Sequence, residues 1–258
     1  MNTPNTTCFV PISLEELAER ASLLTRVDRK YLVPASDMHV LLADLESQAR
    51  VLEINGQQHF DYESVYFDTP EAASYLLAAH PRRRRFKART RSYLNTGDCY
   101  LEVKTKGSRG TTAKQRLPYS FDERDRLTAE GRDYIDELLD DASVVGIDSD
   151  TMEPVLTTRY TRTTLFLPGS GSRCTIDSAL FWECDDDALR FTDTVIVETK
   201  SSGQASEVDR LLWKMGHRPD RISKFATGLA ALRPELPHNR WSRVLRQHFV
   251  PALEKVAA

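Results

Sequence analysis

Two kinds of hydrophobic periodicity run along the chain and predict a mixture of strands and helices. Apolar and polar residues follow strand-like patterns over residues 26–33, 64–67, 86–93, 99–106, 113–117, 155–167, 173–177 and 194–200. Apolar residues recur at helical spacing over residues 14–24, 36–45, 71–79, 122–141, 207–215, 225–232 and 241–256. Strands at short, regular intervals favour an antiparallel sheet or barrel with helices mostly outside it, and so an α+β fold.

Local signals mark where several of these elements begin and end. Ser13, followed by Glu16, resembles a capping box at the start of the first helix, and Pro34 stops the first strand. Residues 95–98 and 107–110 have the composition of turns between strands. No linker or internal repeat interrupts the pattern. We therefore expect a flexible leader over residues 1–12 and a single domain over residues 13–258.

Charged residues share one face of the predicted strands. Side chains two residues apart on a strand point to the same side of a sheet, and the residues between the charged ones are mostly apolar, such as Leu101 and Ile176. The sets that share a face are Lys87, Arg89 and Arg91; Glu102, Lys104 and Lys106; Lys114 and Arg116; Arg173, Thr175 and Asp177; Glu198 and Lys200.

The overall charge hides a strong segregation along the chain. The 258 residues include 35 Lys and Arg and 38 Asp and Glu, for a formal net charge of −3. Residues 82–116, however, contain twelve basic and two acidic residues, and residues 121–153 contain twelve acidic and three basic ones. The two blocks nearly cancel, so a near-neutral protein is compatible with a strongly positive site.

Cysteine usage and hydropathy indicate a cytoplasmic protein. The four cysteines, at positions 8, 99, 174 and 184, have no paired spacing and no histidine at zinc-site distance, which is typical of reduced thiols. No apolar run is long enough for a membrane span, and the first ten residues do not resemble a signal peptide. The basic strands also lack the interleaved aromatic residues of a single-strand nucleic-acid binder, so we expect no nucleic-acid partner.

The basic faces of the strands need an explanation. Alternation in one strand is typical of a sheet whose charged face lies in solvent. Five mostly basic strands side by side are different, because like charges facing one another destabilise a sheet. A bound polyanion would remove this conflict. If the sheet closed into a barrel with its charged face inward, the result would be a positive tunnel suited to phosphates, which Arg binds through two donors and Lys as a point charge.

Glu198 is an acid among these bases. A carboxylate facing phosphates is repelled unless a divalent cation such as Mg²⁺ or Mn²⁺ lies between them. Simple pairing with Lys200 or Arg173 explains the residue equally well. From the residues alone, both explanations stay open.

Nine short motifs, in this order along the chain, resemble one known family. They are Arg-Lys-Tyr at 29–31, Ser-Val-Tyr-Phe-Asp-Thr-Pro at 64–70, Lys-Ala-Arg-Thr-Arg at 87–91, Leu-Glu-Val-Lys-Thr-Lys at 101–106, Lys-Gln-Arg at 114–116, Tyr-Thr-Arg-Thr at 160–163, Arg-Cys-Thr-Ile-Asp at 173–177, Ile-Val-Glu-Thr-Lys at 196–200 and Ser-Lys-Phe at 223–225. The sequence resembles the VTC domain, the catalytic domain of polyphosphate polymerases, over about residues 26–232. This domain belongs to the CYTH-like triphosphate tunnel metalloenzymes.

The resemblance implies an eight-stranded antiparallel β-barrel tunnel surrounded by helices, with ATP or another triphosphate and polyphosphate as ligands. It implies that phosphates are held by a set of basic residues: Lys30, Arg89, Arg91, Lys104, Lys114, Arg162, Arg173, Lys200, Arg221 and Lys224, with Lys106 and Arg116 as further candidates. It also implies that Glu198 coordinates the metal, Mn²⁺ or Mg²⁺. The catalytic set would be the same basic residues without Lys106, Arg116 and Arg221.

The reaction implied is transfer of the γ-phosphoryl group of ATP to the end of a polyphosphate chain, with release of ADP. Related triphosphatases begin with an ExExK motif, whereas this chain has Arg-Val-Asp-Arg-Lys at 26–30, so only Asp28 could replace one of those acids. This favours the polymerase. An inorganic triphosphatase or polyphosphatase, or a non-catalytic polyphosphate or nucleotide sensor, are the alternatives. A membrane partner and the oligomeric state stay open.

Overall fold

The computed structural model of the chain describes residues 3–21, 27–106, 112–249 and 254–257. Its strands are β1 (Val10–Ile12), β2 (Val27–Pro34), β3 (Arg50–Leu52), β4 (His59–Asp68), β5 (Arg85–Tyr93), β6 (Asp98–Lys106), β7 (Thr112–Tyr119), β8 (Glu153–Leu167), β9 (Ser172–Cys184), β10 (Asp187–Arg190), β11 (Thr194–Ser201) and β12 (Glu254–Ala257). Its α-helices are α1 (Leu14–Arg20), α2 (Met38–Leu45), α3 (Ala73–Ala79), α4 (Ala129–Asp141), α5 (Glu207–Lys214), α6 (Lys224–Leu232) and α7 (Ser242–Val244).

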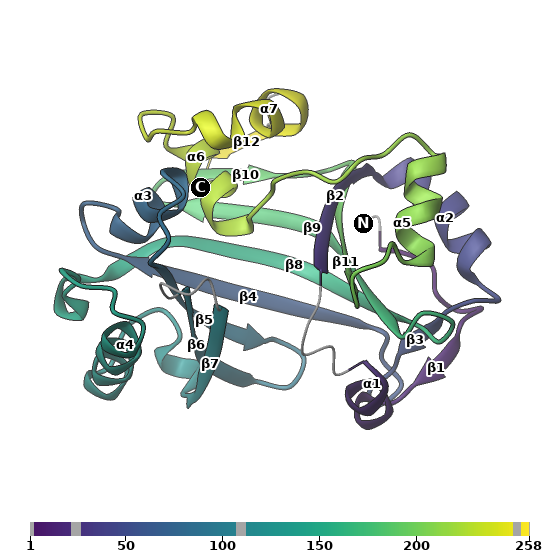
Figure 1. Cartoon of the computed structure of the whole chain (residues 1–258), viewed down its shortest axis with the longest axis horizontal. Helices are drawn as coiled ribbons and strands as arrows, with labels where there is room; N and C mark the ends of the chain where they lie inside the picture. Colours follow the sequence, from purple (N-terminus) through teal and green to yellow (C-terminus); the bar gives the residue numbers. More distant parts are fainter. Residues whose placement is uncertain (1–2, 22–26, 107–111, 250–253, 258) are drawn as a thin grey trace.

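Eight strands form the continuous part of one curved sheet, in the order β2-β11-β9-β8-β4-β5-β6-β7. Every neighbouring pair in this path is antiparallel, which confirms the α+β class with a large antiparallel sheet. With β1, β3, β10 and β12, the sheet has twelve strands among the described residues, more than the predicted eight. The long strand β9 pairs with β11 in its first half and with β10 in its second, so the sheet branches there. In Figure 1, β4, β8 and β9 run side by side as long ribbons, with β5, β6 and β7 below them.

The predicted barrel is not closed. Among the described residues, β2 pairs with β11 alone and β7 pairs with β6 alone, so the two ends of the path do not meet. The first half of β7 is exposed, in keeping with an edge strand. A physical reason is that helix α6 (Lys224–Leu232) packs against the concave face through Phe225 and Tyr66, and so fills space that the two edges would have to close around.

Helices cover the convex side of the sheet in two places. Helices α2 and α5 pack on β2, β11 and β9 through side chains such as Leu41, Val197 and Leu212. Helix α4 packs on β5 and β6 through side chains such as Ile135 and Leu101. Figure 1 shows these helices at opposite ends of the molecule. The apolar positions that alternate with the charged ones along the strands therefore face these helices, and the charged positions face the concave side.

Helix α6 lies on the concave side and fills part of it. Phe225 stacks on Tyr66 of β4 with ring centroids 5.0 Å apart, and Tyr160, Leu229 and Ile196 belong to the same buried cluster. One part of the concave face is thus apolar and covered by α6, while the rest is charged. The sequence patterns predicted a charged face along each strand, but not this division.

Gly228 allows α6 to approach the sheet closely. A methyl group at this position would overlap the buried ring of Trp182 on β9. The indole nitrogen of the same tryptophan donates a hydrogen bond of 2.8 Å to the carbonyl oxygen of Lys224, the first residue of α6. These contacts fix the position of the start of the helix.

Several sequence-based expectations about individual elements differ from the structure or lie outside the described residues. Val10–Ile12 forms β1, paired in parallel with β3, within the predicted leader. The predicted helix over residues 241–256 is confirmed in its first part, because α7 and a π-helical turn continue to Phe249. It is wrong at its end, because Glu254–Ala257 forms β12 on the edge of β10, which offers backbone hydrogen bonds. The acidic block contains a 3₁₀ helix at Phe121–Glu123, and its α-helix begins only at Ala129. The end of the first predicted helix and the predicted turn at residues 107–110 lie outside the described residues.

No helix among the described residues has the length and hydropathy needed to cross a membrane. Of the four cysteines, Cys99, Cys174 and Cys184 are buried free thiols, and Cys8 is an exposed free thiol.

The close approach of α6 leads to a stability prediction. Gly228→Ala should lower the free energy of unfolding by about 1–3 kcal/mol, because the added methyl group overpacks the contact with Trp182. Denaturant unfolding followed by intrinsic fluorescence measures this change. Gly169→Ala is the control, because its methyl group meets only the flexible carboxylate of Glu207 and should change stability by less than about 0.5 kcal/mol. Equal stability of the two variants would contradict the proposed packing role of Gly228.

Candidate functional site

Basic side chains line the charged part of the concave face. Cross-strand partners in a sheet share a face, and the strand registers pair Lys87 with Lys104, Lys104 with Lys114, and Arg173 with Lys200. The predicted groupings by strand parity are therefore found together in the fold. The basic residues on this face are Lys30, Lys87, Arg89, Arg91, Lys104, Lys106, Lys114, Arg116, Arg162, Arg173 and Lys200.

Glu102 on β6 holds the first cluster of charges. Its carboxylate accepts hydrogen bonds from Arg89 at 2.6 and 2.9 Å and from Lys114 at 2.6 Å, and Arg91 lies 3.7 Å away. The Glu102 side chain is only 5% exposed. Burial alone would raise the pKa of this carboxyl, but Arg89 and Lys114 outweigh burial and hold the pKa below its usual range.

Asp177 on β9 holds the second cluster and joins the sheet to α6. Arg162 on β8 donates two parallel hydrogen bonds to its carboxylate, at 2.6 and 2.8 Å, and Lys224 at the start of α6 donates a third. Asp177 is fully buried. Burial opposes ionisation, but the two cations lower the pKa of Asp177 below its ordinary value, so the group stays a carboxylate.

Glu198 on β11 lies at the centre of the third cluster. Its carboxylate is 3.0 Å from the Lys30 amine and 3.6 Å from the Lys200 amine. Burial would raise the pKa of Glu198, but the two lysines lower it well below the usual range. Burial lowers the pKa of Lys200 to about 8, while Glu198 acts in the opposite direction. The predicted pairing of Glu198 with Lys200 is present, and Lys30 takes the place suggested for Arg173.

Lys87 is a half-buried cation whose parity on β5 places it on the charged face, although no role was predicted for it. Its amine donates a hydrogen bond of 3.1 Å to the Ser223 hydroxyl and lies 5.0 Å from the centre of the Phe225 ring. Burial, reinforced by Arg89 and other nearby cations, lowers the pKa of Lys87 well below its ordinary value. The parity of Lys87 with Arg89 and Arg91 was the signal that could have identified it.

The remaining predicted residues lie towards the edges of the face. Arg173 is half-buried on β9, and exposed Arg116 on β7 lies over the Tyr100 ring at 4.7 Å. Lys106 on β6 and Arg221, just before α6, line a cavity of 330 Å³ at one end of the charged face.

The conflict among like charges is partly resolved by the protein itself. The strand patterns alone predict mostly basic strands whose like charges face one another. In the fold, Glu102, Asp177 and Glu198 each bring two or more cations together, and these acids come from three different strands. A polyanion is therefore not the sole counter-charge on this face, although the bases listed above outnumber the acids.

The acids present fit a metal that takes most of its ligands from a phosphate. Among the residues described, no group of three or more His, Cys, Asp or Glu side chains is placed to hold a metal ion. Glu198 is 14% exposed on the concave face, and Asp28 lies on the same face of β2, opposite Lys200. Mg²⁺ commonly binds one or two carboxylates and completes its shell with water and substrate phosphates. The site fits that pattern.

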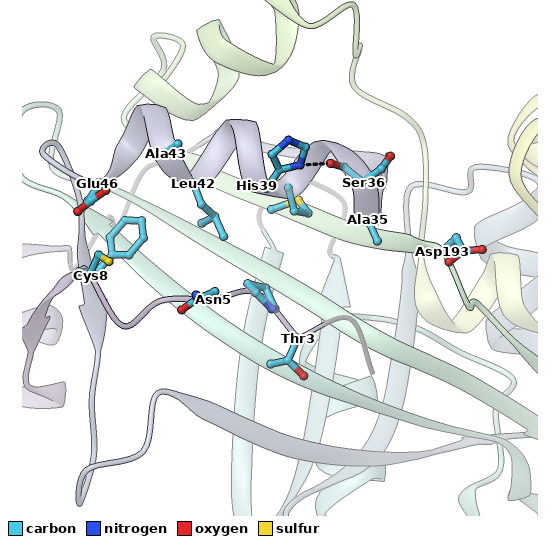
Figure 2. Close-up of a pocket in the computed structure, with 13 residues that line it drawn as sticks. Thr3, Asn5, Cys8, Ala35, Ser36, His39, Leu42, Ala43, Glu46 and Asp193 are labelled. Carbon is cyan, nitrogen blue, oxygen red and sulfur yellow. Dashed lines mark hydrogen bonds between the residues drawn. The ribbon is translucent and has the colours of Figure 1, made fainter.

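A second pocket lies away from the charged face. Figure 2 shows it between the N-terminal segment and α2, with Cys8, Leu42 and Glu46 at one end and Asp193 at the other. Its volume is 540 Å³, and none of its lining residues is Lys or Arg. It is therefore unsuited to phosphates, and the concave face is the candidate site.

Comparison with known proteins decides the family. The family model of the VTC domain matches residues 25–233, which is most of the chain. The chain belongs to the VTC domain family. No curated protein matches it at a significant level.

Solved structures are similar to this VTC domain at low sequence identity, and one of them, with a TM-score above 0.5, shares its fold. A candidate adenylate cyclase from Bacillus halodurans is 13% identical, with 77% of this chain and 93% of that chain covered and a TM-score of 0.51. A Hippeastrum protein, a candidate adenylyl cyclase described as having a dominant triphosphatase activity, is 16% identical over 83% of this chain and 99% of its own, with a TM-score of 0.46. At these identities the likeness concerns the fold alone.

The Glu102 cluster gives a prediction about charge balance. Glu102→Gln should lower the free energy of unfolding by about 1.5–3 kcal/mol, because the half-buried Arg89 and the exposed Lys114 lose the buried carboxylate that accepts their hydrogen bonds. Tripolyphosphate should then raise the melting temperature of the variant more than that of the unaltered protein, because phosphate oxygens replace the lost acceptor. Thermal unfolding with and without tripolyphosphate measures both effects.

The matched control is Glu123→Gln, because Glu123 pairs on the surface with Arg126 at 3.2 Å. That substitution should change neither the stability nor the shift with tripolyphosphate. An equal tripolyphosphate shift in all three proteins would show that phosphate does not reach the Glu102 cluster.

Proposed function

We propose that this VTC domain is a metal-dependent polyphosphate polymerase that transfers the γ-phosphoryl group of ATP to a polyphosphate chain. The observation that carries the proposal is the concave face itself. Basic side chains from seven strands and from α6 converge there, around the partly exposed carboxylate of Glu198. Such a surface is suited to a chain of phosphates, which is a linear polyanion with many acceptor oxygens.

The chemistry requires positioning and charge neutralisation rather than a side-chain nucleophile. An oxygen of the terminal phosphate of the acceptor chain forms a bond to the γ-phosphorus of ATP. The bond from that phosphorus to the β–γ bridging oxygen breaks, and the electron pair leaves with ADP. Lysine and arginine donors stabilise the negative charge on the transferred group and on the leaving oxygen.

The residues proposed for this work fall into two groups. Those proposed to act on the reacting phosphates are Lys30, Arg89, Arg91, Lys104, Lys114, Arg162, Arg173, Lys200 and Lys224. Those proposed to bind the substrate further along the face are Lys106, Arg116 and Arg221. The pairs Arg89–Glu102 and Arg162–Asp177 hold their guanidinium groups in fixed orientations, with donors left over for phosphate oxygens.

Glu198 is the proposed protein ligand for Mn²⁺ or Mg²⁺. Such an ion, when bound, polarises phosphate oxygens as a Lewis acid. Because Lys30 and Lys200 keep Glu198 ionised, its carboxylate is ready to share an ion with the substrate at neutral pH. The two lysines then become free to pair with phosphate oxygens.

A hydrolase is the second candidate, and Asp28 is the observation that favours it. Asp28 lies on the concave face of β2, two residues from Lys30, so the site offers a second carboxylate near Glu198. In a triphosphatase, water would replace the acceptor phosphate. We favour the polymerase because the motif of the related triphosphatases supplies two glutamates where this chain has only Asp28.

We place this activity in the cytoplasm, with ATP and polyphosphate as ligands. Three of the four cysteines are buried free thiols, which suits a reducing compartment.

The direct test incubates purified protein with ATP and either Mn²⁺ or Mg²⁺, and follows polyphosphate on gels together with free phosphate. Growth of polyphosphate with formation of ADP is the expected result. Release of orthophosphate from tripolyphosphate without chain growth would favour the hydrolase. Binding of tripolyphosphate without turnover under either metal would indicate a sensor.

Glu198→Gln tests the metal role within the same assay. The substitution should abolish turnover and leave tripolyphosphate binding in place, because the amide cannot replace a metal-binding carboxylate but leaves the basic residues untouched. Isothermal titration gives the binding and the polymerisation assay gives the turnover. Glu183→Gln is the control, because Glu183 pairs with Arg159 away from the charged cluster. Full turnover in Glu198→Gln would remove Glu198 from the mechanism.

A further inference from the structure

A cavity of 330 Å³ lies where β5, β6 and β7 meet the start of α6 and the segment before α7. Arg85 begins β5, Lys106 ends β6, and Arg240 comes from the short 3₁₀ helix Asn239–Trp241. The cavity is continuous in the fold with the Glu102 cluster, because it is also lined by Lys87 and Lys104, which are opposite one another in the register next to Arg89 and Glu102.

The cavity is strongly and uniformly positive. Six of its lining residues are basic, and none of its lining residues is acidic: the basic ones are Arg85, Lys87, Lys104, Lys106, Arg221 and Arg240. Within the described parts of the chain, none of these six forms an ion pair with a carboxylate. This contrasts with Arg89, Arg162 and Lys30, which are each paired with an acid.

Three of the guanidinium groups are close enough to affect one another. Burial lowers the pKa of Arg240, and repulsion from Arg85 and Arg221 lowers it further. The protein nevertheless holds two of them in place. Arg85 donates a hydrogen bond of 2.8 Å to the carbonyl oxygen of Arg82, and Arg240 donates one of 2.9 Å to that of Ala78. An anion in the cavity would relieve this repulsion.

The lining favours phosphate over a nucleoside. A base needs an accessible ring to stack on, and the two aromatic side chains that line the cavity, Phe86 and Trp241, are only 3% and 4% exposed. Arg240 also lies 6.0 Å from the centre of the Trp241 ring. The cavity also contains no carboxylate that could accept hydrogen bonds from a base or a ribose. Phosphate oxygens, by contrast, match all six basic residues.

We propose that this cavity is a secondary site that binds phosphate groups of a polyphosphate chain beyond those at the Glu198 centre. The inference rests on the proposed function, which supplies the chain, and it adds a preference for long chains over short ones. A chain that reaches from the central face into the cavity gains contacts with Arg85 and Arg240 that tripolyphosphate is too short to make. The cavity thus sets how affinity depends on chain length.

The test compares two probes, tripolyphosphate and a longer polyphosphate of defined length, by isothermal titration at fixed salt concentration, and repeats the titration with ATP. The double variant Arg85→Ala/Arg240→Ala should lose about tenfold in affinity for the long chain and keep its affinity for tripolyphosphate. The charge-conserving variant Arg85→Lys/Arg240→Lys should retain most of the preference for the long chain. The matched control Arg83→Ala/Arg243→Ala removes two exposed arginines that do not line this cavity and should leave both affinities unchanged.

Each other outcome overturns the inference in a distinguishable way. If the unaltered protein binds both probes equally well, the secondary site is absent although the proposed function stands. If it binds neither probe, the proposed function fails as well. If both double alanine variants lose the same affinity, the effect comes from general charge rather than from the cavity. If Arg85→Ala/Arg240→Ala weakens the binding of ATP but not of either polyphosphate, the cavity holds the nucleoside instead.

Discussion

The fold depends on keeping many like charges together on one concave surface. Water-exposed lysines and arginines are easily accommodated, but cations facing one another across a half-enclosed sheet repel strongly. Three carboxylates, Glu102, Asp177 and Glu198, offset this repulsion, and each is held by cations from neighbouring strands or from α6. Because these acids are buried or nearly so, they also fix the orientation of their partners. The charge balance that stabilises the sheet thus prepares the phosphate-binding surface.

Helix α6 connects this electrostatic arrangement to the hydrophobic core. Its apolar side packs on the concave face through Phe225 and Leu229, close to Trp182, while its first residue, Lys224, reaches Asp177. Ser223 caps the helix and also accepts a hydrogen bond from Lys87. The same helix therefore contributes to the core, to the charged clusters and to the edge of the secondary cavity. A shift of α6 would change all three together.

The sequence predicted the strands and their charged faces because a strand has a period of two, which fixes the face of Arg89 or Glu198 without any long-range information. It did not predict which acids pair with which bases, because the Arg162–Asp177 pair depends on the register between β8 and β9. The open edge between β2 and β7, and the strand β12, also depend on pairing between distant segments. Lys87 carried the right parity, but its contact with the Phe225 ring follows from the position of α6.

The most direct test of the central claim is a crystal structure of the protein with tripolyphosphate and Mn²⁺, using the anomalous signal of manganese. The account predicts phosphate groups on the concave face, in contact with Arg89, Lys200 and Lys224, and a manganese peak beside the Glu198 carboxylate. Tripolyphosphate bound on the convex side, or in the pocket beside α2, would contradict it. So would phosphates on the concave face with manganese bound away from Glu198.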